Sequence, residues 1–206
     1  MEKVRCMDKK IIIGVVAVIV IIVAGYFLVS DAIERSSPIN TADQSQLDPP
    51  SNKIADISHI QNPTQLKSLS LCSKDIVDIT PLEGLTGLKS LQMTSNHISD
   101  ITPLEGLIKL ESLSLSRNNI SDITPLRDFV YLYFLTLKSN KISDISALGG
   151  LTELTSLRLS NNNITDITVV RDLTKLKYLN LWGNPISEDY TCEDLQEDLP
   201  DTRITC

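Results

Sequence analysis

Residues 110–131 read LESLSLSRNNISDITPLRDFVY, and residues 154–175 read LTSLRLSNNNITDITVVRDLTK. The two stretches carry the same residue types at the same positions, and five further copies keep the same spacing of 22 residues. The copies open at Gln44, Leu66, Leu88, Leu110, Leu132, Leu154 and Leu176. Self-similarity at a fixed period of this length predicts a solenoid, in which each copy stacks on the next.

Each copy contains apolar residues in alternation, as in Leu113-Ser114-Leu115. Alternation with period two predicts a short strand with one buried face. The residues between the leucines then point outward, and stacked turns pair their strands in parallel, roughly 4.8 Å apart.

An asparagine recurs just after the strand in five consecutive copies. These residues are Asn96, Asn118, Asn140, Asn162 and Asn184. Because an amide has both donor and acceptor groups, a ladder of asparagines can satisfy the backbone groups of neighbouring turns. We expect this ladder to be structural.

A Thr-Pro-Leu phrase follows at residues 80–82, 102–104 and 124–126. A hydroxyl residue is a common N-cap and proline is favoured at the first helical position, so the phrase predicts a single helical turn. The fold class expected is therefore an α/β solenoid, with a parallel concave sheet and short 3₁₀ or α turns on the convex side.

An aspartate precedes each of these turns and would stack like charges along the coil. The column comprises Asp56, Asp78, Asp100, Asp122, Asp144 and Asp166. Such a column is tolerable only if each carboxylate is solvated or accepts backbone hydrogen bonds. A cation-binding ladder is the alternative, but repeat geometry explains the column without it, and we expect no metal and no cofactor.

The repeats lose their regularity at both ends. The copy at residues 44–65 is degenerate and has a proline pair in its strand position, which suits the edge of a sheet. The last copy departs into an acidic amphipathic stretch at residues 192–199, whose polar face is typical of a terminal cap. We therefore place the repeats at 44–187 and a C-terminal cap at 188–206.

The repeats resemble the leucine-rich repeats of the internalins, which share the phrase Ser-Asp-Ile-Thr-Pro-Leu found at residues 99–104 and 121–126. They are similar as well to the repeats of a eukaryotic phosphatase regulatory subunit with the same 22-residue length. The tail from Asn184 to Pro200 looks like the C-terminal cap of that second group. The resemblance implies protein recognition without catalysis.

An apolar segment precedes the repeats. Residues 11–29 are 19 consecutive uncharged residues, and as a helix they would span about 28 Å, close to the hydrocarbon thickness of a bilayer. Four basic residues lie in segment 1–10, so the positive-inside rule places that segment in the cytoplasm. A cleaved signal peptide is the alternative to this transmembrane helix. Either reading exports the repeats, and residues 30–43 read as a linker.

The net charge of the repeats and cap excludes some classes of binding partner. Beyond residue 29 there are 15 basic and 24 acidic residues, a net charge of −9. This balance argues against binding of nucleic acid or of anionic lipid. The localisation expected is the cell membrane, single-pass, with the repeats outside the cytoplasm.

Two cysteines bracket the cap. A bridge between Cys192 and Cys206 would form in an oxidising compartment and stabilise the fold by about 2–3 kcal/mol. The alternative is that Cys192 fills an apolar position as a buried thiol. Cys72, on an outward strand position, is expected to remain a thiol. Asn119 and Asn163 open glycosylation sequons.

Large side chains gather on the outward positions of the last three regular strands, whereas the first three strands are small and polar there. The cluster comprises Phe134, Lys138, Arg158, Tyr178, Asn180 and Trp182, with Arg117 and Tyr133 beside it. Exposed aromatic residues with an interleaved arginine are typical of binding hot spots. The alternative is that Tyr178 and Trp182 merely cover the last strand beneath the cap.

The sequence offers one conceivable nucleophile–base pair, Cys72 with His97. Their positions in the repeat differ by about 10 Å on strand spacing, whereas the pair would need contact at about 3 Å. We therefore predict a recognition protein that binds a protein or peptide ligand and is not an enzyme. A regulatory scaffold that faces the cytoplasm and binds an intracellular enzyme such as a phosphatase is the alternative.

Overall fold

The computed structural model describes residues 18–23, 26–31 and 65–206. The chain divides into two compact units, residues 1–47 and residues 48–206. The described part of the larger unit contains the regular repeats and the C-terminal cap.

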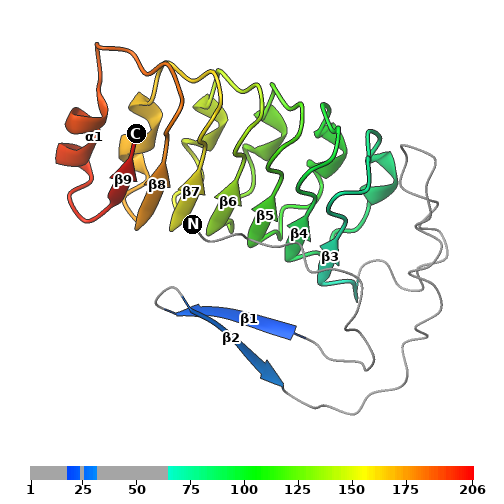
Figure 1. The fold of residues 1–206 in the computed structure, drawn as a ribbon. Coiled ribbons are helices and arrows are strands. Elements are labelled where there is room, and N and C mark those ends of the chain that lie inside the picture. The colour runs from blue at the N-terminus through cyan, green and yellow to red at the C-terminus, as the bar shows by residue number, and fades with distance from the viewer. Residues whose placement is uncertain (1–17, 24–25, 32–64) are drawn as a thin grey trace. The chain divides into compact units, whose positions relative to one another are not determined.

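One strand from each turn joins a seven-stranded parallel sheet, in the order of the sequence (Figure 1). The strands are β3 (Ser68–Ser70), β4 (Ser90–Gln92), β5 (Ser112–Ser114), β6 (Phe134–Thr136), β7 (Ser156–Arg158), β8 (Tyr178–Asn180) and β9 (Arg203–Thr205). From β3 to β8 each residue pairs with the residue 22 positions later, as Leu91 does with Leu113. The parallel sheet predicted from the alternation is confirmed.

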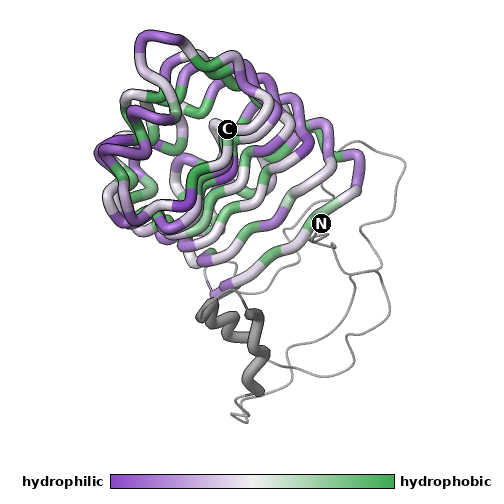
Figure 2. The backbone as a smooth tube through the Cα atoms, turned by 60° about the vertical axis from the view of Figure 1, so that its left-hand side comes forward, coloured by the Kyte–Doolittle hydropathy of each residue, from purple (hydrophilic) through white to green (hydrophobic). Residues whose placement is uncertain are grey.

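The core is a set of apolar columns that run through the stacked turns. Residues of one kind recur at the same place in successive turns of the tube in Figure 2. The middle residues of β4 to β8 are completely buried: Leu91, Leu113, Leu135, Leu157 and Leu179. Phe129 replaces a leucine of the consensus and is also fully buried. Equivalent leucines thus stack from one turn to the next, as expected of a solenoid.

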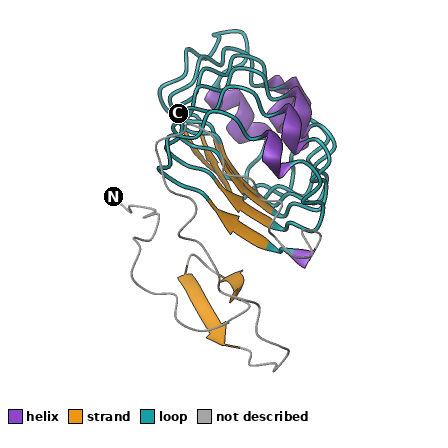
Figure 3. Cartoon of the chain, turned by 90° about the vertical axis from the view of Figure 1, so that its right-hand side faces the viewer, coloured by secondary structure: helices purple, strands orange, loops and turns teal. Residues whose placement is uncertain are grey.

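Short 3₁₀-helices lie on the face opposite the sheet (Figure 3). They are η4 (Thr80–Leu82), η5 (Thr102–Leu104), η6 (Thr124–Leu126), η7 (Ser146–Leu148) and η8 (Thr168–Asp172). The predicted helical turn is present, but the hydroxyl residue is not its N-cap. The helix begins at that residue, and the isoleucine before it is the N-cap and makes no side-chain capping bond.

The aspartate column supplies the missing cap. In every described turn the Oδ1 atom accepts a hydrogen bond from the backbone N–H two residues later, as Asp100 does from Thr102 at 2.9 Å. These bonds lower the pKa of three carboxyl groups below 3.8, with the backbone bond the largest cause at Asp100 and the threonine hydroxyl the largest at Asp122 and Asp166. Backbone hydrogen bonding therefore accounts for the column.

The asparagine ladder is present as predicted. The Oδ1 atom of Asn118 accepts the Ile98 N–H of the preceding turn at 3.1 Å. Its Nδ2 atom donates to the carbonyls of Met93 and Leu115 at 3.0 and 2.9 Å. The same three bonds recur at Asn96, Asn140, Asn162 and Asn184. Each asparagine thus ties two turns together.

A column of left-handed residues follows the strands. Its φ angles lie between 54° and 75° at Ser73, Ser95, Arg117, Ser139, Asn161 and Gly183. Side chains larger than glycine rarely adopt this conformation, and asparagine tolerates it best. At Gly183 a Cβ atom would lie 2.6 Å from the Oδ1 atom of Asn161, so this position has no room for a side chain.

The C-terminal cap consists of α1 (Cys192–Asp198) and β9. Thr191 and Asp194 form a capping box at the start of α1, and Leu195 is buried beneath it. A disulfide joins Cys192 to Cys206, with their Cα atoms 6.5 Å apart. The structure therefore contains the bridge rather than the buried thiol that was its alternative.

The described residues of the smaller unit form an antiparallel pair, β1 (Val18–Val23) and β2 (Tyr26–Asp31), in which Ile21 pairs with Leu28. The structure therefore shows strands, and not the helix predicted over 11–29, at these residues. Valine and isoleucine dominate the segment, and β-branched residues favour extended backbone over helix. Across the described residues no helix is long and apolar enough to span a bilayer.

Other expectations lie outside the described residues. They concern the cytoplasmic segment 1–10, the linker beyond residue 31 and the degenerate copy up to residue 64.

Candidate binding surface on the sheet

The register of the sheet sets two rows of outward side chains on β6, β7 and β8. Phe134, Ser156 and Tyr178 share one row. Thr136, Arg158 and Asn180 share the next row, two residues further along each strand. The two aromatic rings thus flank the small side chain of Ser156, which leaves room between them.

The guanidinium of Arg158 fills that room. Its Cζ atom lies 5.7 Å from the centroid of the Phe134 ring and 5.3 Å from that of the Tyr178 ring. Both distances fall within the range of cation–π attraction. Because Arg158 belongs to the next row, it must fold back along β7 to lie between the rings. We call Phe134, Arg158 and Tyr178 the aromatic–arginine cluster.

The guanidinium is not satisfied by the protein itself. The Nε atom of Arg158 is buried and has no hydrogen-bond partner. Within residues 18–23, 26–31 and 65–206, no hydrogen bond or ion pair involves any other guanidinium nitrogen of Arg158. A buried donor without a partner costs about 1–3 kcal/mol, and the terminal nitrogens of the guanidinium remain the donors that a ligand can reach.

Asn180 and Trp182 extend the surface beside the cluster. The Nδ2 atom of Asn180 donates to the Tyr178 hydroxyl at 3.2 Å, and its Oδ1 atom accepts the Trp182 N–H at 3.1 Å. Asn180 therefore positions its neighbours. The Trp182 side chain is 57% exposed, so it does not merely cover the last strand beneath the cap.

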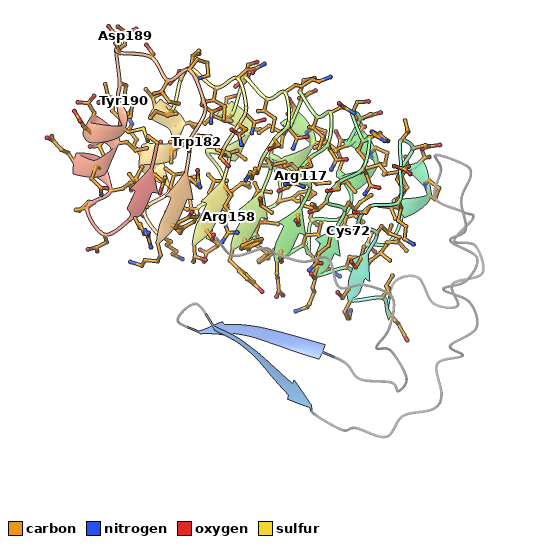
Figure 4. All side chains as sticks on the ribbon, viewed as in Figure 1. Cys72, Arg117, Arg158, Trp182, Asp189 and Tyr190 are labelled. Carbon is orange, nitrogen blue, oxygen red and sulfur yellow. A yellow bond between two sulfur atoms is a disulfide. The ribbon has the colours of Figure 1, made fainter. Side chains whose placement is uncertain are left out.

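Arg117 and Lys138 lie just beyond the carboxyl ends of β5 and β6, and both are exposed. The Arg117 N–H donates to the Lys138 carbonyl at 2.8 Å, which sets the two residues side by side on adjacent turns. Figure 4 labels Arg117, Arg158 and Trp182, which come from three different turns.

Tyr133 lies apart from this group, at the amino end of β6. It is half-buried, and burial raises the pKa of its hydroxyl, with the nearby Glu111 carboxylate adding to the shift. Glu111 itself pairs with Lys89 at 2.6 Å. Tyr133 is thus close to the Lys89–Glu111 pair.

Two features escaped the sequence analysis. Arg203 of β9 pairs with Tyr178 in the sheet, 25 positions later rather than 22, so the repeat period could not reveal it. Ile108, Val130 and Tyr131 are exposed by 46%, 45% and 62% in the segments that lead into β5 and β6. The equivalent positions in the other copies hold threonine, glutamine, glycine or charged residues, so only the solvent exposure distinguishes these three side chains.

The expectation that Cys72 remains a thiol is wrong, because Cys72 is disulfide-bonded. The conceivable pair of Cys72 with His97 is likewise not formed. The Nε2 atom of His97 lies 3.4 Å from the Oδ1 atom of Asp75 instead. In the described part of the chain, no group of three or more potential ligands could hold a metal ion.

The chain matches one protein family and resembles several solved structures. The family described as Leucine Rich repeats (2 copies) matches residues 64–106, 108–151 and 152–197. A search of curated proteins gave no match. Among solved structures, an internalin (inlF) of Listeria monocytogenes is 37% identical with a TM-score of 0.65, over 69% of this chain and 41% of that one. A leucine-rich repeat protein of Leptospira interrogans is 28% identical with a TM-score of 0.64, over 69% and 38%.

The chain therefore spans about two fifths of the length of these two structures. The ectodomain of the Arabidopsis thaliana receptor kinase GASSHO1/SCHENGEN3, solved in complex with CASPARIAN STRIP INTEGRITY FACTOR 2, is 32% identical with a TM-score of 0.54, over 59% and 16%. The family match covers more than half of the sequence and agrees with the sheet, the 3₁₀ turns and the asparagine ladder. The chain belongs to the leucine-rich repeat family.

Proposed function

We propose that this chain is a non-catalytic recognition protein that binds a protein or peptide partner on the sheet face, over β6 to β9. The aromatic–arginine cluster carries the proposal. Two aromatic rings and a guanidinium without a protein partner stand on a sheet whose other outward residues are mostly serine, threonine, asparagine and glutamine. Aromatic residues and arginine contribute most of the binding energy at protein interfaces.

The partner segment that contacts the cluster is small. The grid over three strands measures about 10 Å across the strands and 13 Å along them. That area is well below the roughly 800 Å² per partner of an ordinary interface. Either a short peptide binds, or Trp182 and the polar strands add contacts around the cluster.

A capture experiment tests the proposed surface. The full chain and a variant with Phe134→Ala, Tyr178→Ala and Trp182→Ala would be used as bait in extracts of the source cells. A matched control carries Ser90→Ala, Ser112→Ala and Thr94→Ala, which change the same outward positions on other turns. We expect the aromatic variant to lose the captured protein while its circular dichroism stays unchanged, and the control to retain it. Capture by a folded aromatic variant would refute the surface.

We also propose that the repeats lie outside the cytoplasm, held by the apolar segment 11–29. The support is the length and apolarity of the segment, the basic residues before it and the disulfide between Cys192 and Cys206, which belongs to an oxidising compartment. A single segment that crosses a bilayer must satisfy its own backbone hydrogen bonds, so this anchor requires residues 11–29 to form a helix in lipid in place of the β1–β2 pair.

Protease treatment of intact cells that carry a C-terminally tagged chain, followed by a carbonate wash, tests this location. We expect the tag to be lost from a carbonate-resistant band. A protected tag would contradict the export and would favour the regulatory scaffold that binds an intracellular enzyme.

A further inference from the structure

We infer that the partner segment is an acidic peptide, one of whose carboxylates binds the guanidinium of Arg158. The inference rests on the proposed function and adds the chemistry of the ligand to it.

The charged side chains on the strands, and in the three residues that follow each of β3 to β8, are all cationic. In the described sheet strands β3 to β9, the charged side chains are Arg158 and Arg203. In the three residues that follow β3 to β8, they are Arg117 and Lys138. Four cations thus occupy the face, although the chain as a whole has a net charge of −7.

These cations also lack counter-charges. Elsewhere the repeats pair their charges across turns, as in Lys89 with Glu111 at 2.6 Å and Lys175 with Glu153 at 2.5 Å. For the four cations of the sheet face, no such partner exists among the residues that the structure describes. A group of unneutralised cations favours a partner of the opposite charge.

The setting of Arg158 specifies the group that it binds. The Phe134 and Tyr178 ring centroids lie 5.7 and 5.3 Å from the Cζ atom of the guanidinium, and its Nε atom is buried. A ligand therefore approaches the edge that bears the terminal nitrogens, which can donate two parallel hydrogen bonds to one carboxylate. Arg158 is half-buried, and a hydrogen bond is electrostatically stronger in such surroundings than in water.

The surroundings favour a peptide over other anions. A nucleic acid would meet the net negative charge of the whole chain, and its affinity depends on many phosphate contacts rather than one. The exposed Trp182 and the two rings offer apolar contacts to the residues beside the acidic one. The ligand expected is a short segment with an aspartate or glutamate flanked by apolar side chains.

The test begins with random 12-residue peptides displayed on phage and selected against the immobilised full chain. Enriched peptides are then synthesised with the acid or with its amide, and their affinities are measured by fluorescence anisotropy. The protein variants are Arg158→Gln and, as the matched control on β4, Gln92→Ala. We expect acidic peptides to be enriched, and Arg158→Gln or the amide each to weaken binding about tenfold or more. The two changes together should cost no more than either one, because each removes the same contact.

The outcomes distinguish failure of the acidic ligand from failure of the proposed binding surface. Peptides that lose affinity with Phe134→Ala and Tyr178→Ala but not with Arg158→Gln or the amide would overturn the acidic ligand and leave the sheet-face surface intact. Peptides insensitive to all of these changes would overturn both. Selection without enrichment of acidic residues would overturn the acidic ligand. Circular dichroism of every variant confirms that a loss of binding is not a loss of fold.

Discussion

Arg117 occupies a left-handed position, with φ 57°, where other turns have serine, asparagine or glycine. The left-handed conformation costs an ordinary residue about 1–2 kcal/mol, and asparagine bears it best. We expect Arg117→Asn to raise the free energy of unfolding by up to about 1 kcal/mol in urea titrations. The neighbouring Lys138→Asn, at a position without positive φ, should change it by less than about 0.5 kcal/mol. Equal effects of the two changes would show that the backbone at Arg117 is not strained.

Asn118 is a central member of the asparagine ladder and ties its own turn to the preceding one. It is 8% exposed and bonds to Ile98, Met93 and Leu115. We expect Asn118→Ala to lower the free energy of unfolding by about 3 kcal/mol or more, since it leaves buried backbone groups without partners. Asn119→Ala, at the adjacent and less buried position, is the control and should have a small effect. An equal decrease in the free energy of unfolding for the two variants would contradict a stabilising role of the asparagine ladder.

At the scale of the element, the aspartates that cap the 3₁₀-helices should make stability depend on pH. Hydrogen bonds lower the pKa of Asp100, Asp122 and Asp166 in the folded state. A lowered pKa adds stability above the unfolded value near 3.8, and that contribution is lost as the pH falls through the folded pKa. We expect thermal midpoints to fall between about pH 5 and pH 2.

The variant with Asp100→Asn, Asp122→Asn and Asp166→Asn keeps an acceptor at each helix but loses the charge. Its midpoint should therefore fall less over the same range than that of the wild type. The control is Asp128→Asn, which changes an exposed aspartate outside the column. Its thermal midpoint should fall with pH as much as that of the wild type. An undiminished fall in the triple variant would assign the acid sensitivity to other groups.

The disulfide holds the last element of the sheet. Cys192 and Cys206 are 14 positions apart, and a loop of this length contributes about 3 kcal/mol in the chain-entropy model. We expect the double variant Cys192→Ser, Cys206→Ser to have a free energy of unfolding lower by about 3 kcal/mol. Hydrogen exchange should be faster at the N–H groups of Leu181 and Arg203, which donate hydrogen bonds between the β8 and β9 segments. The Asn119 N–H, which donates to Ile98 in the central turns, should exchange as before. Equally faster hydrogen exchange at all three N–H groups would contradict a stabilising effect confined to the cap.

At the scale of the whole molecule, the regular part of the fold follows from the sequence because each position recurs. The alternation of leucines predicted the strands, and the asparagine spacing predicted the ladder, since identical turns make identical contacts. The strand that departs from the 22-residue period was not predicted. Arg203 of β9 pairs with Tyr178 at a spacing of 25 residues, so the period did not place the two side by side. The length and apolarity of residues 11–29 also favoured a helix, whereas the described residues 18–23 and 26–31 form strands.

The candidate surface was only partly predictable for a similar reason. The register placed Phe134, Arg158 and Tyr178 on neighbouring strands. It could not show that Arg158 folds back between the rings or that its Nε atom has no partner, because both depend on the side-chain conformation.

The most direct test of the binding surface is photo-crosslinking in intact source cells from benzoylphenylalanine at position 138, beside the aromatic–arginine cluster. Position 94, the equivalent site two turns earlier, is the control. We predict one discrete adduct from position 138 that disappears when Phe134→Ala and Tyr178→Ala are added. An adduct from position 94 with none from 138, or one at 138 that survives both changes, would contradict recognition through this cluster.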